Sequence, residues 1–275
     1  MTMFVSFVES SPFHVFDHLV ASGGGTSCTF PVQLYKGFAA GIPPDLDAIV
    51  VASDLQGVAP LAAAGGELRL VGEVLVEQLA ALAERGVIPP LARTGAILAG
   101  DLYSAPKADL RGATGDVRGV WRAFAAHHAW VAGVEGNHDT YGTRDDQLRF
   151  ASEPRIHLLD GDCVQLGGLR VGGVGGIIGD PKKPARRGER DFLRSMRKVL
   201  AMKPDVLVMH HGPDEERGEL RGHPLIRRAL DDSDGLLVIC GHVYWREPLA
   251  MVRGGAQALN VDGRVVVLRR QPARP

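Results

Sequence analysis

The amino-acid sequence predicts an α/β fold whose strands are buried on both faces. Short apolar runs recur along the chain, and each is followed by a cluster of polar residues. Stretches with apolar residues at helical spacing lie between these runs. Alternation of this kind is typical of α/β proteins. A chain of 275 residues can bury a sizeable core without disulfide or metal cross-links.

Five apolar runs are predicted as the main strands. They contain few polar residues, and an uninterrupted apolar run of this length is typical of a strand covered on both faces. The predicted strands are residues 48–51, 96–99, 129–132, 206–209 and 236–239.

Helical periodicity predicts three helices between the strands. In residues 67–85, leucine and valine recur at helical spacing, and Gly86 ends the pattern. Residues 117–127 and 191–201 are the other two predicted helices. Near the C-terminus, residues 257–268 contain Asp-Gly in their middle, which predicts a β-hairpin.

The first 45 residues have a different character from the rest. Residues 4–8 are apolar enough to begin a strand, residues 22–27 are rich in glycine and predict a flexible loop, and Pro43-Pro44 interrupts regular structure. We therefore expect residues 1–45 to be an N-terminal extension packed on a main domain of residues 46–275.

Composition excludes several classes of protein. With 31 Lys and Arg against 32 Asp and Glu, the net charge is −1, which does not favour nucleic acid as a partner. Three widely spaced cysteines do not suggest a disulfide framework, so we expect a cytoplasmic protein. No apolar run approaches the roughly 18 residues of a membrane span, so no membrane partner is expected.

Polar residues of one chemical kind follow the five predicted strands. In open α/β sheets, ligands bind beyond the carboxyl ends of the strands. Carboxylate, amide and imidazole groups at these ends suit Mn, Fe or Zn. A single strand-end Asp is more often a helix cap, but five such residues in order predict a metal site. They are Asp54, Asp101, Asn137, His210 and His242.

These residues resemble the ordered motifs of the calcineurin-like metallophosphoesterases. The pattern of that family is D-x-H, G-D, G-N-H-[DE], H and G-H-x-H. The motifs of this chain span residues 54–244, and the Gly-Asn-His-Asp followed by Gly-His is their most specific part. They are Asp54-Leu55-Gln56, Gly100-Asp101, Gly136-Asn137-His138-Asp139, His210 and Gly241-His242-Val243-Tyr244.

The resemblance implies a fold and a metal centre. The fold is a metallophosphoesterase-type sandwich of two mixed β-sheets flanked by helices, formed by residues 46–275. In the metal centre, Asp101 bridges two ions. Asn137, His210 and His242 complete the second metal site, and Asp54 belongs to the first.

The resemblance also implies a reaction. Two metals hold the phosphate oxygens and lower the pKa of a bound water, and the metal-bound hydroxide attacks phosphorus in line. His138 is expected to lie over the phosphate rather than bind metal. There it would stabilise or protonate the leaving group, oriented by Asp139.

Two positions depart from the family pattern, and both concern the first metal. Gln56 and Tyr244 stand where the family has histidine. One account is that Gln56 ligates through its amide oxygen and Tyr244 through a phenolate, giving a harder site. A second is that the first metal binds weakly or only with substrate. A third is that catalysis is lost. We favour the first two accounts together, because Asp54, Asp101 and His138-Asp139 persist.

Some neighbouring residues leave alternatives open. His210 fits the strand-then-His order, whereas alignment on Gly212-Pro213 selects His211. Tyr103 resembles the tyrosine ligand of purple acid phosphatases but is one residue too close to Gly-Asp, so packing or substrate contact is expected. His14 and His18 have a spacing that binds metal on a helix, but no third ligand is in view.

Two further segments lie between the site motifs. The glycine-rich run 172–179 fails both the dinucleotide fingerprint and the P-loop pattern, so a tight turn with close strand packing is expected. A basic loop follows and would attract a polyanionic substrate, although most such runs are merely solvated. Its basic residues are Lys182, Lys183, Arg186, Arg187 and Arg190.

The sequence therefore predicts a metal-dependent phosphoesterase, either a phosphodiesterase or a phosphatase. We expect one or two divalent metal ions per chain, Mn²⁺ or Fe, with Zn²⁺ as an alternative. The expected substrate is a small phosphorylated molecule or a nucleotide. The alternative is a non-catalytic phosphate- or nucleotide-binding module on the same fold. Nothing in the sequence indicates the oligomeric state.

Overall fold

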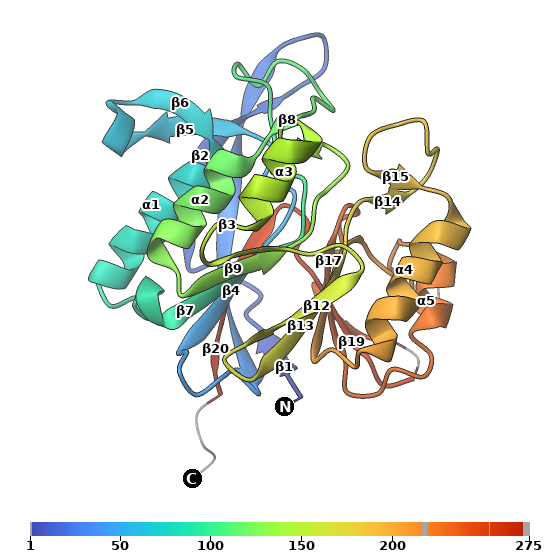
Figure 1. Cartoon of the computed structure of the whole chain (residues 1–275). Helices are drawn as coiled ribbons and strands as arrows, with labels where there is room; N and C mark the ends of the chain where they lie inside the picture. Colours follow the sequence, from blue (N-terminus) through green and yellow to red (C-terminus); the bar gives the residue numbers. More distant parts are fainter. Residues whose placement is uncertain (1, 216–218, 253, 272–275) are drawn as a thin grey trace.

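The computed structural model describes residues 2–215, 219–252 and 254–271 (Figure 1). Two mixed sheets pack against each other, and helices cover their outer faces (Figure 1). This is the predicted sandwich of two mixed β-sheets flanked by helices, and the prediction is confirmed. All five main strands form where they were predicted.

The larger sheet has ten strands, and residues from both ends of the chain meet at its centre. The strands β4, β7, β9 and β11 run parallel to one another, whereas β20 is antiparallel to β4 and parallel to β3. β1 pairs with the end of β3. Across the sheet the order is β11 (Ile156–Leu158), β9 (Trp130–Gly133), β7 (Thr94–Leu98), β4 (Ala48–Ala52), β20 (Arg264–Arg270), β3 (Ser27–Ala40), β2 (His14–Ala21), β5 (Val58–Leu61) and β6 (Glu67–Leu70), with β1 (Phe4–Val8) beside β3.

The smaller sheet has six strands, and its centre is also parallel. The order is β12 (Asp162–Leu166), β13 (Leu169–Val174), β16 (Val206–His211), β17 (Leu237–Gly241), β19 (Gln257–Asn260) and β18 (Leu249–Met251). Two short parallel pairs lie outside both sheets. They are β8 (Gly115–Asp116) with β10 (Asp139–Thr140), and β14 (Ile177–Ile178) with β15 (Arg186–Arg187).

Three apolar layers form the core. One lies between the larger sheet and its helices, one between the two sheets, and one between the smaller sheet and its helices. This layering explains the uninterrupted apolar strands, because each central strand is covered on both faces. The larger sheet carries α1 (Val71–Glu84), α2 (Arg118–His127) and α3 (Arg144–Ala151), and the smaller carries α4 (Glu189–Ala201) and α5 (Pro224–Ala229) (Figure 1).

The predicted helix 67–85 is shorter in the structure. Residues 67–70 form β6, which pairs with β5 across the turn at Gly65 and Gly66. Both glycines have positive φ, which suits the chain reversal of a hairpin. Leu68 is exposed, and only from Val71 onward do the periodic apolar residues reach the core. The prediction of the helix start was therefore wrong by four residues, from 67 to 71.

The predicted hairpin over 257–268 is wrong. β19 pairs with β17 and β18 in the smaller sheet, whereas β20 pairs with β3 and β4 in the larger one. Residues 261–263 carry the chain from one sheet to the other. Both apolar runs are buried on both faces. If they paired with each other as a hairpin, each sheet would lose one of its strands.

Residues 4–40 form three strands of the larger sheet. β3 lies between β20 and β2, and Val5 and Leu34 are fully buried. The glycine-rich residues 22–26 connect β2 to β3. The first 45 residues thus share their sheet and their core with the rest of the chain.

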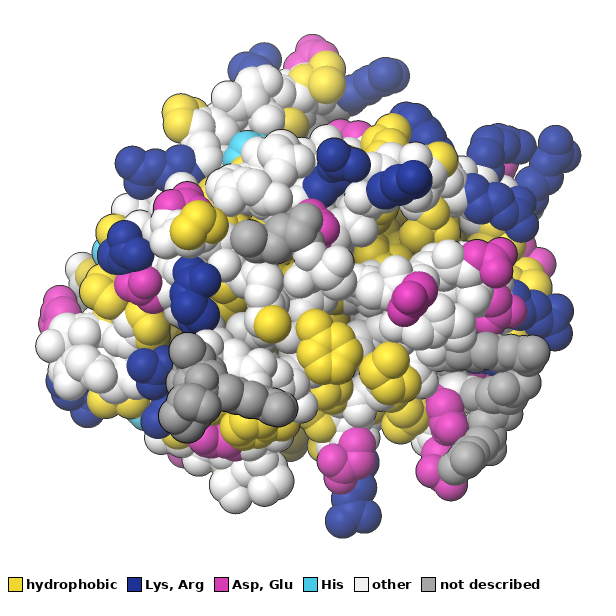
Figure 2. Space-filling model, turned by 90° about the horizontal axis from the view of Figure 1, so that it is seen from below, with side chains coloured by type: hydrophobic (Ala, Val, Ile, Leu, Met, Phe, Trp, Pro, Cys, Tyr) yellow, Lys and Arg dark blue, Asp and Glu magenta, His cyan; other side chains and the backbone are white. Residues whose placement is uncertain are grey.

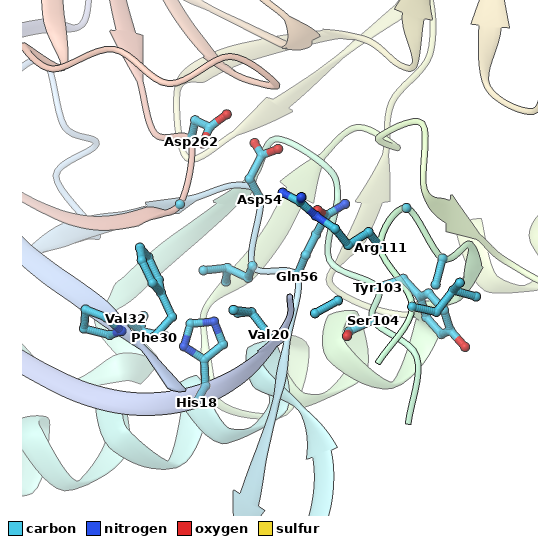
Figure 3. Close-up of a pocket in the computed structure, with 17 residues that line it drawn as sticks. His18, Val20, Phe30, Val32, Asp54, Gln56, Tyr103, Ser104, Arg111 and Asp262 are labelled. Carbon is cyan, nitrogen blue, oxygen red and sulfur yellow. The ribbon is translucent and has the colours of Figure 1, made fainter. Parts of the chain in front are cut away.

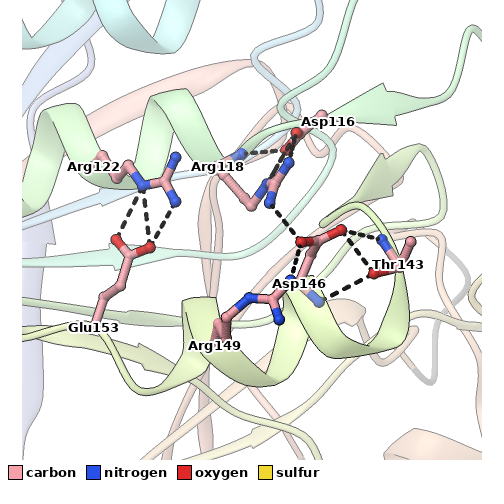
Figure 4. Close-up of polar contacts among 7 residues, drawn as sticks. All are labelled: Asp116, Arg118, Arg122, Thr143, Asp146, Arg149 and Glu153. Carbon is pink, nitrogen blue, oxygen red and sulfur yellow. Dashed lines mark hydrogen bonds and ion pairs between the residues drawn. The ribbon is translucent and has the colours of Figure 1, made fainter.

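Ion pairs join α2, α3 and the loops around them (Figure 4). Thr143 accepts a hydrogen bond from the backbone of Asp146, whose carboxylate accepts one from the Thr143 backbone, so α3 begins with a capping box. Arg118 pairs with Asp116, and Arg122 pairs with Glu153 beyond the end of α3.

The face that carries both termini has mixed charge. Seen from below, side chains of Lys and Arg, of Asp and Glu and of apolar residues are scattered over this face (Figure 2). This distribution agrees with the net charge of −1. Among the residues that the structure describes, no helix is long and apolar enough to cross a membrane.

The position of β3 gives a prediction about stability. Leu34→Ala removes a fully buried side chain from the middle of the larger sheet, so we expect it to lower the free energy of unfolding by about 2–5 kcal/mol. Leu148→Ala is the control, because Leu148 is 60% exposed, and it should change stability by less than about 0.5 kcal/mol. Urea unfolding of both variants checks this; equal, small effects would show that β3 contributes little to the core.

Candidate metal centre

The five strand-end residues lie at the edge where the two sheets meet. Asp54 follows β4 and Asp101 follows β7, and Asn137 lies beyond β9. His210 lies within β16, and His242 follows β17. The parallel strands bring their carboxyl ends to one edge.

Asp101, His210 and His242 form the tightest cluster. Their ligand atoms all lie within 4.8 Å of one another. The His210 Nε2 atom lies 3.3 Å from Asp101 Oδ2. On its other side, His210 Nδ1 lies 2.8 Å from the carbonyl oxygen of Ala99. That carbonyl can only accept a hydrogen bond, so it fixes the ring orientation and leaves Nε2 free to bind a metal.

The backbone is left-handed at three of the site residues. Asp54 and Asp101 each have φ of 55°, and His242 has φ of 69°. Non-glycine residues rarely adopt this region, and they do so most often at functional sites. Hydrogen bonds hold the conformation, because the Asp54 N–H donates to the Gly100 carbonyl and the His242 N–H donates to Asp54 Oδ2 at 2.9 Å.

Asp139 has different partners from those expected. Its carboxylate accepts three backbone hydrogen bonds, from Asp101 at 2.8 Å, Leu102 at 2.8 Å and Gly136 at 2.9 Å. The His138 Nδ1 atom is buried without a hydrogen-bond partner in the described part of the chain. Asp139 thus joins the loop after β7 to the loop after β9, and it does not orient the His138 ring.

His138 itself lies close to Asp101. Its backbone N–H donates to Asp101 Oδ1 at 2.9 Å, and its Nε2 atom lies 4.0 Å from Asp101 Oδ2. The side chain is 20% exposed. It can therefore reach a molecule bound at the cluster.

The structure separates the two substituted positions. Gln56 lies in the site, and its Nε2 donates to Asp101 Oδ2 at 3.2 Å. Tyr244 has a different neighbour. It is 58% exposed, and its ring packs under the Arg264 guanidinium, 4.7 Å from the ring centroid.

His211 lies beside the cluster on the same strand. Its Nδ1 accepts a hydrogen bond from the Ile178 N–H at 3.2 Å, and its ring packs between those of His242 and His223. Burial, with three neighbouring histidines, lowers the pKa of His211 to about 3. Of the two adjacent histidines, the structure directs His210 toward Asp101.

The electrostatics of the site are dominated by buried carboxylates. Burial raises the pKa of Asp54 to about 8, and the nearby Asp262 and Asp101 act in the same direction. Burial alone lowers the pKa of His210, but Asp101 and Asp54 outweigh it and raise that pKa to about 10. The site thus favours an additional positive charge.

The donor set fits a divalent metal ion. The Asn137 Oδ1 atom is buried and has no hydrogen-bond partner in the described part of the chain. His210 Nε2 approaches Asp101 without making a hydrogen bond. Buried polar atoms normally have partners. Carboxylate, amide and imidazole donors that converge in this way can hold Mn, Fe or Zn.

A cavity of about 420 Å³ opens beside the metal centre (Figure 3). β2 and β3 supply one wall, including His18 and Phe30, and the loop with Tyr103 and Arg111 supplies another. Arg111 extends over the cavity toward Asp54 and Gln56 (Figure 3). The sequence motifs did not identify Phe30 or Arg111 as site residues, because neither belongs to a metal-ligand motif.

Asp262 also lines this cavity, next to Asp54 (Figure 3). The sequence prediction missed it because Asp-Gly is a strong hairpin signal. On each side of Asp262 lies an apolar run of the kind found in strands that are buried on both faces. These two runs were the sign in the sequence that the chain changes sheet there.

The remaining predicted features have structural partners. His14 lies on a strand, not a helix, and contacts Gln78. Gly173 packs against Leu159, as expected for close strand packing. Tyr103 lines the cavity and contacts Gly115.

The basic loop is partly neutralised. Arg187 forms an ion pair with Asp160 at 2.6 Å. Arg186 and Arg187 form β15, which pairs with β14. Arg186 acts on His242 electrostatically, so this part of the loop lies near the metal centre.

Comparisons with solved structures give distant matches. A 5′-nucleotidase precursor from Thermus thermophilus is 15% identical with a TM-score of 0.42; the match covers 78% of this chain and 48% of that one. A Thermus thermophilus sulfate thiohydrolase in complex with glycerol is 14% identical with a TM-score of 0.41, covering 84% and 58%. A protein of unknown function from Aquifex aeolicus is 14% identical with a TM-score of 0.33, covering 80% and 95%.

This chain thus spans about half the length of the nucleotidase precursor that it matches. No curated protein matches the chain. The family comparison is more informative, because the model of the calcineurin-like phosphoesterases matches residues 48–245, which include every motif at the metal centre. The chain belongs to the calcineurin-like phosphoesterase family.

Proposed function

We propose that this protein is a metal-dependent phosphoesterase that hydrolyses a phosphodiester or phosphomonoester of a small molecule or nucleotide. The observation that carries the proposal is the convergence of Asp101, His210 and His242 within 4.8 Å. The family match and the neighbouring cavity support it.

The contacts at Asp101 support an assignment of the metal ligands. Asp101 would contribute to both metal sites, since His210 and Gln56 both lie close to its Oδ2 atom. Asn137, His210 and His242 would complete the second site, and Asp54 and Gln56 would belong to the first. When bound, divalent metals hold phosphate oxygens and activate a water molecule as the nucleophile. Mn²⁺ or Fe suits this mixed donor set, with Zn²⁺ as an alternative.

His138 is the proposed proton donor. It is partly exposed beside Asp101, and its Nδ1 has no partner in the described residues that would draw the ring away. From this place it can donate a proton to the leaving oxygen of the substrate. Asp139 is a positioning residue, because it fixes the backbone on both sides of the site.

The cavity is the proposed place for the part of the substrate beyond the phosphate. Phe30 and His18 offer ring surfaces, and their centroids lie 6.3 Å apart. Arg111 offers a cation near Asp54. A planar group attached to a phosphate, such as a nucleoside, matches this combination. For the compartment we infer the cytoplasm, since Cys28 is free and exposed, which suits a reducing environment.

A second candidate function is a non-catalytic phosphate-binding module. Gln56 and Tyr244 favour it, because they stand where the family has the two histidines of the first metal site. The two functions differ in turnover, which one assay distinguishes.

Hydrolysis of chromogenic phosphodiesters and phosphomonoesters tests the proposal. After chelation and readdition of Mn²⁺, Fe²⁺, Zn²⁺ or Mg²⁺, we expect metal-dependent turnover by the wild type. Asp101→Ala should abolish it, because Asp101 contacts both halves of the site, while Asp232→Asn, an exposed control outside the site, should retain it. Binding of metal and phosphate without turnover would favour the binding module instead.

Metal binding should stabilise the folded protein. At a Mn²⁺ concentration one hundred times the Kd, the expected gain is about 2.7 kcal/mol, since the ion binds only the folded state. Asp101→Asn should fold, because Asn tolerates the left-handed backbone of this position. Mn²⁺ should not raise the free energy of unfolding of this variant. Thermal unfolding with and without Mn²⁺ measures this, and an equal rise in Tm for Asp101→Asn and Asp232→Asn would contradict it.

Arg111 is expected to bind the substrate rather than the metal. Arg111→Ala should raise KM about tenfold, the cost of one charged hydrogen bond, and should lower kcat less. Lys107→Ala is the matched control, because Lys107 is an exposed cation of the same loop that does not line the cavity. Steady-state kinetics check this; a large fall in kcat at unchanged KM would assign Arg111 another role.

A further inference from the structure

The loss of two histidines leaves the first metal site short of donors. Asp54 remains there, and Gln56 contributes an amide. The Gln56 Nε2 atom donates to Asp101, so its Oε1 atom is the end available to a cation. A further donor at this place has to come from outside the family motifs.

Asp262 is held beside Asp54 by the backbone. It lies on the crossing from β19 to β20, where an isolated bridge joins it to Ser53. The Gly263 N–H donates to the Ser53 carbonyl at 3.2 Å, and the Asp262 N–H donates to Asn260 Oδ1 at 3.2 Å. The position of Asp262 is therefore as well defined as that of Asp54.

The Asp262 carboxylate faces the same cavity as Asp54 and Gln56. In Figure 3, Asp54 lies between Asp262 and Gln56, and the carboxylates of Asp54 and Asp262 are close together. Asp262 and Asp101 both act on the charge of Asp54, and Asp101 also acts on that of Asp262. Asp54 and Asp262 thus line one cavity, and Asp101 lies near both.

No described Lys or Arg side chain contacts Asp54 or Asp262 directly. Within residues 2–215, 219–252 and 254–271, neither Asp54 nor Asp262 forms an ion pair with Lys or Arg. Arg264 is near, but its Nη2 atom donates to the Trp245 carbonyl and its guanidinium packs on Tyr244. His210 offsets part of this negative charge, because it acts with the opposite sign on Asp54, Asp101 and Asp262. A bound cation offsets the part that remains.

An independent observation at the same centre also points to a cation. Asn137 is 5% exposed, and its Oδ1 atom is buried without a hydrogen-bond partner in the described residues. An unpaired ligand atom thus reaches the centre from the loop after β9, and Asp262 lines the neighbouring cavity from the crossing between β19 and β20.

We propose that Asp262 is a ligand of the first metal, together with Asp54, Asp101 and Gln56, in place of the two missing histidines. All four donors are oxygen atoms, so this site selects a hard cation such as Mn²⁺ or Mg²⁺ over Zn²⁺. This assignment gives Tyr244 no part, because its ring packs on Arg264 and its side chain is largely exposed. The assignment rests on the proposed function, since it presumes a metal centre.

Mn²⁺ binding to the full-length protein tests this assignment without any measurement of turnover. The stoichiometry follows from the electron paramagnetic resonance signal of free Mn²⁺ and from calorimetry. We expect two Mn²⁺ per wild-type chain. Asp262→Asn removes the charge and Asp262→Ala removes the donor, and each should bind one Mn²⁺ tightly and the second at least about tenfold more weakly. Asp232→Asn and Tyr244→Phe are controls that should bind two.

The outcomes separate this inference from the proposed function. Two Mn²⁺ with unchanged affinities in both Asp262 variants would overturn the role of Asp262 and leave the metal centre standing. A single Mn²⁺ in the wild type would do the same. A wild-type chain that binds no metal would contradict the proposed function itself. Circular dichroism of the variants checks that lost binding is not lost folding.

Discussion

Buried negative charge at the edge between the two sheets is the constraint on which the rest of this structure depends. Asp101 is 3% exposed, and it is approached by the His138 N–H, by Gln56 and by His210. Asp139 is equally buried, and three backbone N–H groups surround its carboxylate. Because a buried carboxylate without partners is costly, these contacts fix the loops after β7 and β9 and the strand β16 in one arrangement.

The buried negative charge at this edge also explains the strained backbone. Asp54, Asp101 and His242 turn in the left-handed region directly after their strands. An ordinary extended or helical continuation would carry each side chain away from the edge. The strain costs on the order of 1–3 kcal/mol per residue, and the hydrogen bonds from His242 to Asp54 and from Asp54 to Gly100 hold it in place.

Structural features that depend on residues close together in the chain can be predicted from the sequence. The apolar runs and the polar residues after them place β4, β7, β9, β16 and β17, and with them the strand-end residues of the site. Partners far apart in the sequence are not predictable in this way. The Asp139 carboxylate binds backbone 37 and 38 residues away, and no local pattern distinguishes that from contact with its neighbour His138.

The change of sheet near the C-terminus shows the same limit. Residues 257–268 satisfy every local criterion of a hairpin, yet their two strands join different sheets. Each strand pairs where a sheet has an open position, beside β17 for one and beside β4 for the other. The location of these open positions is a property of the whole fold. The sequence analysis missed Asp262 for this reason, because its Asp-Gly turn pattern gave no sign that it lines the cavity beside Asp54.

The charge of the centre connects Asp262 to Arg111. The family pattern places two carboxylates and neutral histidines around two divalent ions. With Asp262 as a proposed third carboxylate beside Asp54 and Asp101, a centre with two divalent ions would keep less positive charge for an incoming phosphate. A phosphate anion would be held more weakly by such a centre. Arg111 extends to the same side of the cavity, and its fixed positive charge would offset that loss for a bound phosphate.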